Sequence, residues 1–139
     1  MQAMTLKSPG GLDQLSLKNI EPTVPGPGEV QVEVKASSLN FHDYVVVLGL
    51  LPTDDGRIPL SDGAGIVTAV GEGVSKFQVG DKVLSHFFPL WQDGRPNFER
   101  IQGVPGDNVD GFAAGSVTAA ASTFSRMPRN LDFAEAATL

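Results

Sequence analysis

The stretch from Ser61 to Val83 constrains the fold of this chain more than any other. Gly63 and Gly65 stand one residue apart, a spacing that lets a backbone approach a pyrophosphate in a dinucleotide-binding turn. That motif needs a small residue three positions after the second glycine and then a helix, but Thr68 stands there in a β-branched run. Because β-branched side chains are stiff and suit a pleated surface, the stretch predicts a strand that ends at the turn Gly71-Glu72-Gly73. A phosphate-binding loop is the less favoured interpretation.

Sixteen glycines and ten prolines among 139 residues indicate many turns and short strands. The clearest strand is Glu29 to Ala36, where valines at 30, 32 and 34 alternate with polar residues. Four further strands are expected from shorter patterns, and residues 92–110 are expected to be irregular. The expected strands are 2–6, 14–20, 112–121 and 123–127.

Two short helices follow from capping residues. Asn40 or Ser38 can cap a helix that runs through Tyr44 to Leu48, and Gly49 can end it. Asp132 can cap a second helix over residues 133–139.

Composition argues against several classes of protein. The formal charge is −6 and the basic residues are scattered, which argues against a sequence-independent grip on nucleic acid. No segment approaches the run of about 20 apolar residues that a membrane helix needs. The first residues lack the basic head and apolar core of a signal peptide, so the sequence predicts a cytoplasmic protein.

Metal and thiol chemistry have few candidate residues. The chain has no cysteine, which removes disulfides, thiolate nucleophiles and cysteine-ligated zinc. Only His42 and His86 are available as imidazole ligands, which argues against a multi-histidine metal site.

Five motifs in a fixed order resemble the N-terminal half of the medium-chain dehydrogenase/reductase superfamily. The resemblance is greatest to its zinc-independent NADPH:quinone oxidoreductases and to the alcohol dehydrogenases near them. The motifs are Pro25-Gly26-Pro27-Gly28-Glu29-Val30, then Ser38-Leu39-Asn40-Phe41 with Asp43, then Asp62-Gly63-Ala64-Gly65 continuing to Val74, then Phe77 to Val83 around Gly80-Asp81, and finally Ala136-Ala137-Thr138.

The resemblance implies a mainly β fold: a GroES-like, irregular antiparallel β-barrel with short helices that forms one wall of an active-site cleft. Residues 1–128 would form this substrate-side domain, and residues 129–139 a linker to a dinucleotide-binding Rossmann domain that the chain lacks. The complete enzyme would be a homodimer that transfers hydride from NADPH or NADH to an apolar quinone, enone or carbonyl. The 139-residue chain alone is expected to be inactive and to bind no cofactor.

Three positions distinguish this sequence from zinc-dependent relatives, which carry cysteine, histidine and glutamate where Asn40, Ser61 and Asp62 stand here. An amide and a hydroxyl are poor zinc ligands beside thiolate and imidazole. The resemblance therefore implies chemistry without a metal. Taken alone, Asp62 is more typical of a turn or cap residue than of a metal ligand.

The resemblance also suggests catalytic and cofactor-binding residues. Asn40 would lie close to the nicotinamide end of the cofactor, where an amide can donate and accept, although a helix-capping role fits equally. Asp43 is a candidate catalytic residue in a supporting role, with a structural role as the favoured alternative. Thr138 would lie near the nicotinamide carboxamide.

A substrate pocket for a flat apolar molecule is expected from aromatic residues, although the barrel core is an open alternative for them. His42 can serve as a proton relay, but a buried structural histidine is the more common case. The candidate pocket residues are Phe41, Tyr44, Phe87, Phe88 and Trp91.

Two other classes remain open from sequence. The chain can be a non-enzymatic GroES-like binding module of the co-chaperonin type, which would assemble into a ring. It can also be a relative that keeps the fold as a scaffold without turnover.

Overall fold

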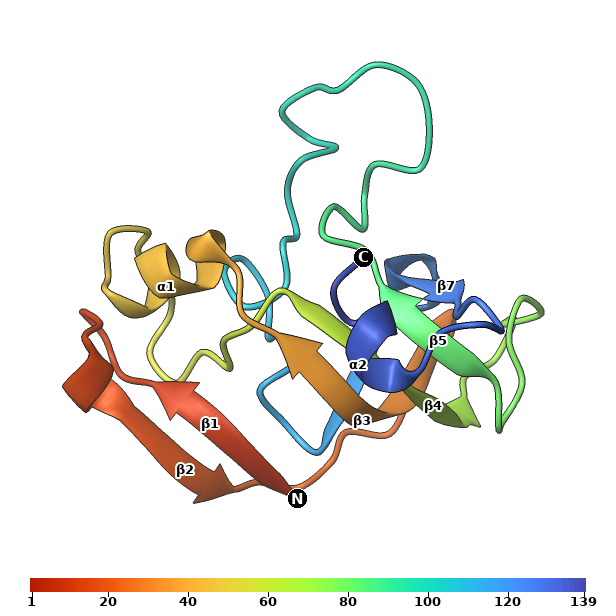
Figure 1. The fold of residues 1–139 in the computed structure, drawn as a ribbon, viewed down its shortest axis with the longest axis horizontal. Coiled ribbons are helices and arrows are strands. Elements are labelled where there is room, and N and C mark those ends of the chain that lie inside the picture. Colours follow the sequence, from red (N-terminus) through yellow and green to blue (C-terminus); the bar gives the residue numbers. More distant parts are fainter.

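The computed structural model describes residues 1–139 as a mainly β fold with short helices (Figure 1). The strands are β1 (Gln2–Leu6), β2 (Leu15–Asn19), β3 (Glu29–Ser38), β4 (Asp62–Val70), β5 (Lys82–Ser85), β6 (Ser116–Ala120) and β7 (Phe124–Arg126). The helices are α1 (Phe41–Val47) and α2 (Phe133–Ala136), with single 3-10 turns η1 (Leu12–Gln14) and η2 (Ala121–Thr123).

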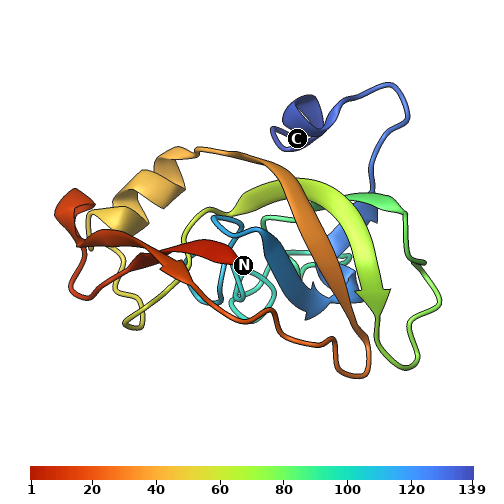
Figure 2. The ribbon, with the colours of Figure 1, turned by 90° about the horizontal axis from the view of Figure 1, so that it is seen from below.

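Five strands form one antiparallel sheet in the order β6-β3-β4-β5-β7, and β1 pairs with β2 in a separate hairpin. Figure 2 shows the strong curvature of β3 and β4, which wraps the sheet around its core. The expected mainly β, GroES-like class is confirmed. The barrel is not closed by hydrogen bonds, because β6 and β7 are the two edges of the sheet.

The core lies inside this curved sheet, and the alternation in β3 explains it. Val30 and Val32 are 0% and 1% exposed, because both point from β3 to the same inner face. Aromatic and branched residues from the other strands and from the chain before β6 complete this core. Its buried members are Val30, Val32, Val67, Phe77, Val83, Phe112, Val117 and Phe124.

The glycines that suggested a phosphate loop allow close packing of β4, which confirms the strand interpretation. A Cβ on Gly65 would lie 2.1 Å from the backbone oxygen of Glu33 on β3. A Cβ on Gly63 would lie 2.4 Å from the ring of Phe112. Both positions therefore exclude a side chain.

Three details differ from the sequence-based expectation. Residues 112–115 are not a strand, because Phe112 turns into the core and only Ala114 forms an isolated bridge, to Ala3. The strand expected over 14–20 is shorter and mostly exposed, because only β1 covers it. The helix expected over 133–139 is a single turn.

The segment predicted to be a linker, 129–139, packs back onto the molecule. Helix α2 contacts β3 and β4, and buries Ala136 and Ala137 against Ala64 and Met127. Its cap is as predicted: Asp132 accepts a hydrogen bond from the amide of Glu135 at 2.8 Å.

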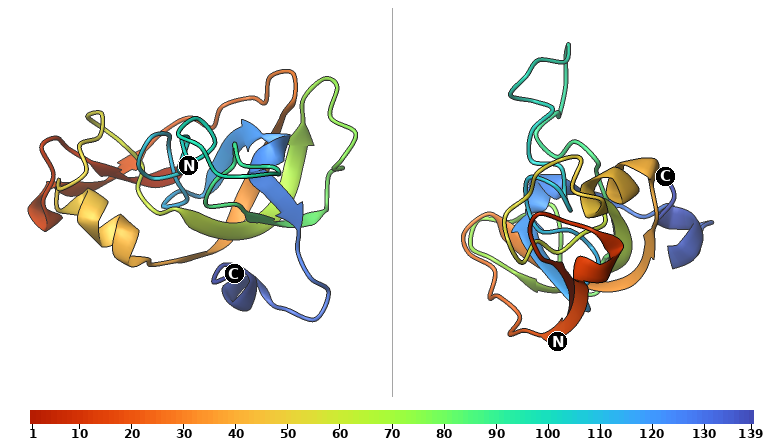
Figure 3. Two further views of the ribbon diagram at one scale, coloured as in Figure 1. Left: turned by 90° about the horizontal axis from the view of Figure 1, so that it is seen from above. Right: turned by 90° about the vertical axis from the view of Figure 1, so that its left-hand side faces the viewer.

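The long connection between β5 and β6 projects from the body of the molecule (Figures 1 and 3), in agreement with the irregular 92–110 segment expected from the sequence. No helix has the length and apolar character needed to cross a membrane.

Candidate functional site

The candidate site lies where β3 leads into α1, beside the start of β4. Asn40 is the N-cap of α1, and Asp43 is the third residue of the helix; together they form a capping box. This arrangement confirms the predicted cap and brings the polar residues of two distant segments together.

Asp43 ties these two segments to each other. Its side chain is 2% exposed, and both carboxylate oxygens accept backbone amides: Oδ2 from Asn40 at 2.8 Å and Oδ1 from Ser61 at 2.8 Å. Asp43 is thus a positioning residue for the N-terminus of α1 and the start of β4. Its catalytic role stays a prediction.

The side-chain amide of Asn40 adds direct contacts between the start of α1 and the start of β4. Nδ2 donates to Oγ of Ser61 at 3.0 Å and to Oδ2 of Asp62 at 2.6 Å. The structure therefore gathers the three residues that the sequence singled out for their difference from zinc-dependent relatives.

Asp62 is the residue of this cluster whose pKa is shifted. Burial raises the pKa of its carboxyl, the hydrogen bond from Asn40 opposes that change, and the nearby charge of Asp43 adds to it. At a given pH, Asp62 thus retains its proton more readily than an exposed aspartate.

Strand β5 brings the aromatic residues next to this cluster. Ala64 pairs with Leu84, and the amide of Gly63 donates to Oγ of Ser85 at 2.9 Å. Phe87, two residues after Ser85, then reaches α1, where its ring lies 5.2 Å from that of His42. The sequence did not single out Ser85, because only strand pairing reveals its contact.

Three of the predicted pocket aromatics form one chain that starts at α1. The ring centroids of His42 and Phe87 are 5.2 Å apart, those of Phe87 and Phe88 4.8 Å, and those of Phe88 and Trp91 6.2 Å. None of these rings belongs to the buried core clusters, which argues against the core alternative. Their role as the wall of a substrate pocket stays a prediction.

The other two predicted pocket residues lie on the surface of α1, where Phe41 is 80% and Tyr44 51% exposed. Thr138 is exposed as well, and its Oγ1 donates to the backbone oxygen of Glu135 at 2.8 Å. None of the five predicted pocket residues lines the largest cavity, which lies along β6.

Both histidines are partly buried, but their surroundings differ. Nε2 of His42 lies 3.5 Å from Oδ2 of Asp107 and has no hydrogen bond, a contact with the projecting loop that the sequence did not predict. Nε2 of His86 lies 2.6 Å from Oγ of Ser125. Burial lowers the pKa of His86, the charge of Lys76 lowers it further, and a backbone hydrogen bond at Ser122 opposes both.

The residues at the candidate site do not fit zinc. They offer an amide, a hydroxyl and one carboxylate, and the amide donates to the carboxylate that would have to act as ligand. No group of three or more histidine, aspartate or glutamate side chains is arranged so that it could hold a metal ion. Zinc sites are built chiefly from thiolates and imidazoles.

Comparison with known proteins identifies the family. The model of the alcohol dehydrogenase GroES-like domain matches residues 26–129. The chain belongs to this family, and the resemblance to medium-chain alcohol dehydrogenases and quinone oxidoreductases is confirmed.

Three relatives illustrate the family's range. A zinc-type alcohol dehydrogenase-like protein of Schizosaccharomyces pombe is 40% identical over 132 residues, which cover 93% of this chain and 38% of that protein. The cobalt- and zinc-bound thermostable alcohol dehydrogenase from Pyrobaculum aerophilum has a TM-score of 0.87 and 30% identity, over 100% of this chain and 44% of its own. Quinone oxidoreductase from Pseudomonas syringae pv. tomato has a TM-score of 0.78 and 27% identity, over 99% and 37%. The chain thus spans less than half the length of these relatives.

Proposed function

We propose that the protein to which this chain belongs is a zinc-independent oxidoreductase that transfers hydride from NADPH or NADH to an apolar quinone, enone or carbonyl. One observation carries the proposal: the amide of Asn40 joins Ser61 and Asp62 in a hydrogen-bonded cluster with no thiolate or imidazole. Membership in a family of alcohol dehydrogenases and quinone oxidoreductases supports the reaction class.

The nicotinamide cofactor would supply the hydride, and the residues of this chain would orient the reactants and exclude water. Asn40 suits the cofactor side, because an amide can both donate and accept without bringing in charge. Thr138 is a further cofactor-binding residue in this proposal. Phe41, Tyr44, Phe87, Phe88 and Trp91 would face the substrate.

Reduction of a carbonyl needs a proton as well as a hydride. The hydride adds to the carbonyl carbon, the π electrons move to the oxygen, and a proton completes the alcohol. Asp62 is the candidate residue to pass on this proton, because its carboxyl lies in the same cluster as Asn40. Asp43 holds this cluster in place.

The remaining parts of the proposal concern the complete protein. It would place a dinucleotide-binding domain against the aromatic side of this domain, after a linker at residues 129–139, and would be a cytoplasmic homodimer. Support for a further domain comes from the relatives, of which this chain covers 37–44% in the two solved structures.

The test is NADPH oxidation by the protein from its complete reading frame, with 1,4-benzoquinone, an enone and an aldehyde as substrates. We expect turnover of at least one substrate, and a loss of about a hundredfold in kcat/KM for Asn40→Ala. Ser37→Ala is the matched control, because Oγ of Ser37 donates to the backbone oxygen of Asp62 without touching the side-chain cluster. No oxidation with any substrate would contradict the proposal.

A further inference from the structure

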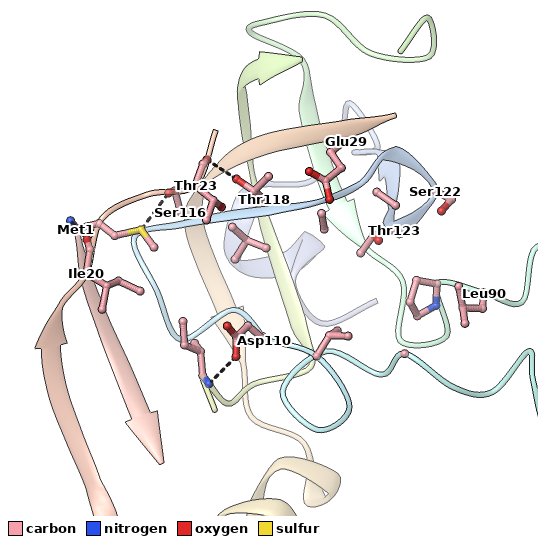
Figure 4. A pocket seen from close by; sticks show the side chains of 18 of the residues that line it. Met1, Ile20, Thr23, Glu29, Leu90, Asp110, Ser116, Thr118, Ser122 and Thr123 are labelled. Carbon is pink, nitrogen blue, oxygen red and sulfur yellow. Dashed lines mark hydrogen bonds between the residues drawn. The ribbon is translucent and has the colours of Figure 1, made fainter. Parts of the chain in front are cut away.

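The largest cavity, of about 560 Å³, lies along the outer edge of β6 (Figure 4). No residue of the Asn40 cluster lines it. Its walls come from the chain before β3, from the foot of the projecting loop and from the segment before β6, and they are mostly apolar. The lining residues used below are Glu21, Glu29, Asp110, Ser116, Thr118 and Ala120.

Strand β6 directs unused backbone groups into this cavity. It pairs with β3 through Val30↔Ala119 and Val32↔Val117, and the amide of Ala121 donates to the oxygen of Gly28 at 2.9 Å in the same two-residue step. In an antiparallel ladder the intervening residues point their N–H and C=O groups the other way. The outward residues are Ser116, Thr118 and Ala120, and none of them uses its backbone groups elsewhere in the fold.

Strand β1 forms backbone hydrogen bonds with the residues just before β6, but not with β6 itself, where the cavity begins. The chain just before β6 is bonded to β1, since the amide of Gly115 donates to the oxygen of Gln2 at 2.9 Å and Ala3 bridges Ala114. At Ser116 the contact is reduced to the side chain of Met1. An extended segment in the cavity would therefore continue the line of β1 along β6.

The charges of the lining residues indicate which charge a bound segment would carry. Three carboxylates line the cavity, at Glu21, Glu29 and Asp110. Asp110 is already paired with Arg57 at 3.0 Å. Met1, whose ammonium donates to the oxygen of Ile20, is the only lining residue with a positive charge. Glu21 and Glu29 are therefore the carboxylates without a cation partner. Figure 4 shows Glu29 beside β6 and Asp110 on a separate loop. In each of these two carboxylates one oxygen accepts hydrogen bonds within the fold and the other has none.

We propose that the cavity binds an extended, basic peptide segment, which adds as a strand to the edge of β6. Main-chain hydrogen bonds to Ser116, Thr118 and Ala120 would hold it, apolar side chains would fill the walls, and a lysine or arginine would face Glu29. An exposed sheet edge is a natural template for such pairing.

The test uses the 139-residue chain and a capped hexapeptide of alternating valine and threonine that contains one lysine. Binding is followed by amide shifts in two-dimensional NMR. The amide protons of Ser116, Thr118 and Ala120 should move downfield, and those of Val117 and Ala119, which face β3, should move little. Peptide-induced shifts confined to other parts of the molecule would overturn the proposal.

Substitutions at Thr118 and Glu29 test the main-chain hydrogen bonds and the charge contact separately. Thr118→Pro removes one outward N–H and no bond to β3, so it should weaken binding about tenfold, and Thr118→Val, which keeps the N–H, should change it by less than about threefold. Glu29→Gln should weaken binding of the lysine peptide and leave unchanged that of a peptide with glutamine in place of the lysine. Equal affinities of the two Thr118 variants would overturn the proposal.

The proposal also requires that the occupant is a basic peptide, and not a second copy of this chain or an acidic peptide. If sedimentation shows that the chain dimerises without peptide and Thr118→Pro abolishes the dimer, β6 pairs with a second copy and the proposal fails. Preference for a peptide with glutamate in place of lysine would equally refute it.

Discussion

Nδ2 of Asn40 lies 2.6 Å from Oδ2 of Asp62, a contact between residues that are 22 positions apart in the chain. The contact joins the N-cap of α1 to the first residue of β4, and the carboxylate of Asp43 supports it from inside the fold. A helix cap and a candidate cofactor contact are thus the same residue. The two sets of contacts use different atoms, because the backbone amide of Asn40 donates to Asp43 whereas its side-chain Nδ2 donates to Ser61 and Asp62.

Asp43→Asn should destabilise the domain. The amide would present a donor to one of the two backbone N–H groups that Asp43 accepts, and leave that group unsatisfied in a buried position. We expect a loss of about 2 kcal/mol in the free energy of unfolding, measured by urea denaturation. Asp132→Asn is the control, because Asn caps the exposed helix α2 as well as Asp does, and its effect should stay within about 0.5 kcal/mol.

Removal of the charge of Asp62 should stabilise the domain near neutral pH. Burial raises the pKa of Asp62 above the ordinary aspartate value of 3.8, so the folded state binds the proton more tightly than the unfolded state. Stability therefore falls as pH rises from that value through the raised pKa, and the penalty is fully present above it. Asp62→Asn should unfold at higher urea concentration than the native chain at neutral pH, and this gain should vanish as pH falls toward 3.8.

The opposite sign for Asp62 would show that its hydrogen bond outweighs its desolvation. A native chain more stable than Asp62→Asn at neutral pH is the contradicting result. Asp13→Asn, in the exposed turn before β2, is the control for loss of one negative charge.

His86 should titrate below the ordinary histidine value of 6.5, and part of that shift should depend on Lys76. Lys76→Met should move the pKa of His86 upward, by less than the full shift, because burial is the larger cause. Imidazole proton signals followed by NMR across pH give both values. Lys82→Gln removes a cation that lies over Phe133 instead, and no change in His86 is expected.

The depressed pKa of His86 has a consequence for stability. The unfolded state binds the proton more readily, so the domain should lose stability as pH falls through 6.5 and stop losing it below the folded pKa. A pKa of His86 that does not respond to Lys76→Met would refute this account of its environment.

Gly65→Ala should be among the most damaging small substitutions. The new Cβ would lie 2.1 Å from the backbone oxygen of Glu33, so β3 and β4 would have to separate. We expect a loss of about 3 kcal/mol, read from thermal and urea unfolding. Gly115→Ala is the matched control, since its nearest neighbour would be 3.6 Å away; similar losses in the two variants would contradict the close-packing explanation.

The sequence predicted the elements that depend on local pattern. The valine alternation gave β3, the β-branched run after Gly65 gave β4, and Asn40 and Asp132 gave the caps of both helices. Each of these follows from neighbours in the chain, where side-chain period and capping chemistry are decisive.

The sequence did not predict the contacts between segments that are far apart in the chain. Ser85 and Asp107 approach the site through strand pairing and the path of the projecting loop, and nothing beside them in the sequence marks them. The cavity at β6 is lined by several segments that are far apart in the chain, so no local pattern marks it. Helix α2 ends at Ala136, and the amides of Thr138 and Leu139 each donate to the oxygen three residues before them rather than four.

Metal content and activity, measured on one preparation of the protein from its complete reading frame, test the central claim most directly. We expect NADPH oxidation that survives exhaustive treatment with a chelator, and a protein that contains no stoichiometric zinc. Activity lost with the chelator and restored by zinc would contradict metal-free chemistry at Asn40, Ser61 and Asp62.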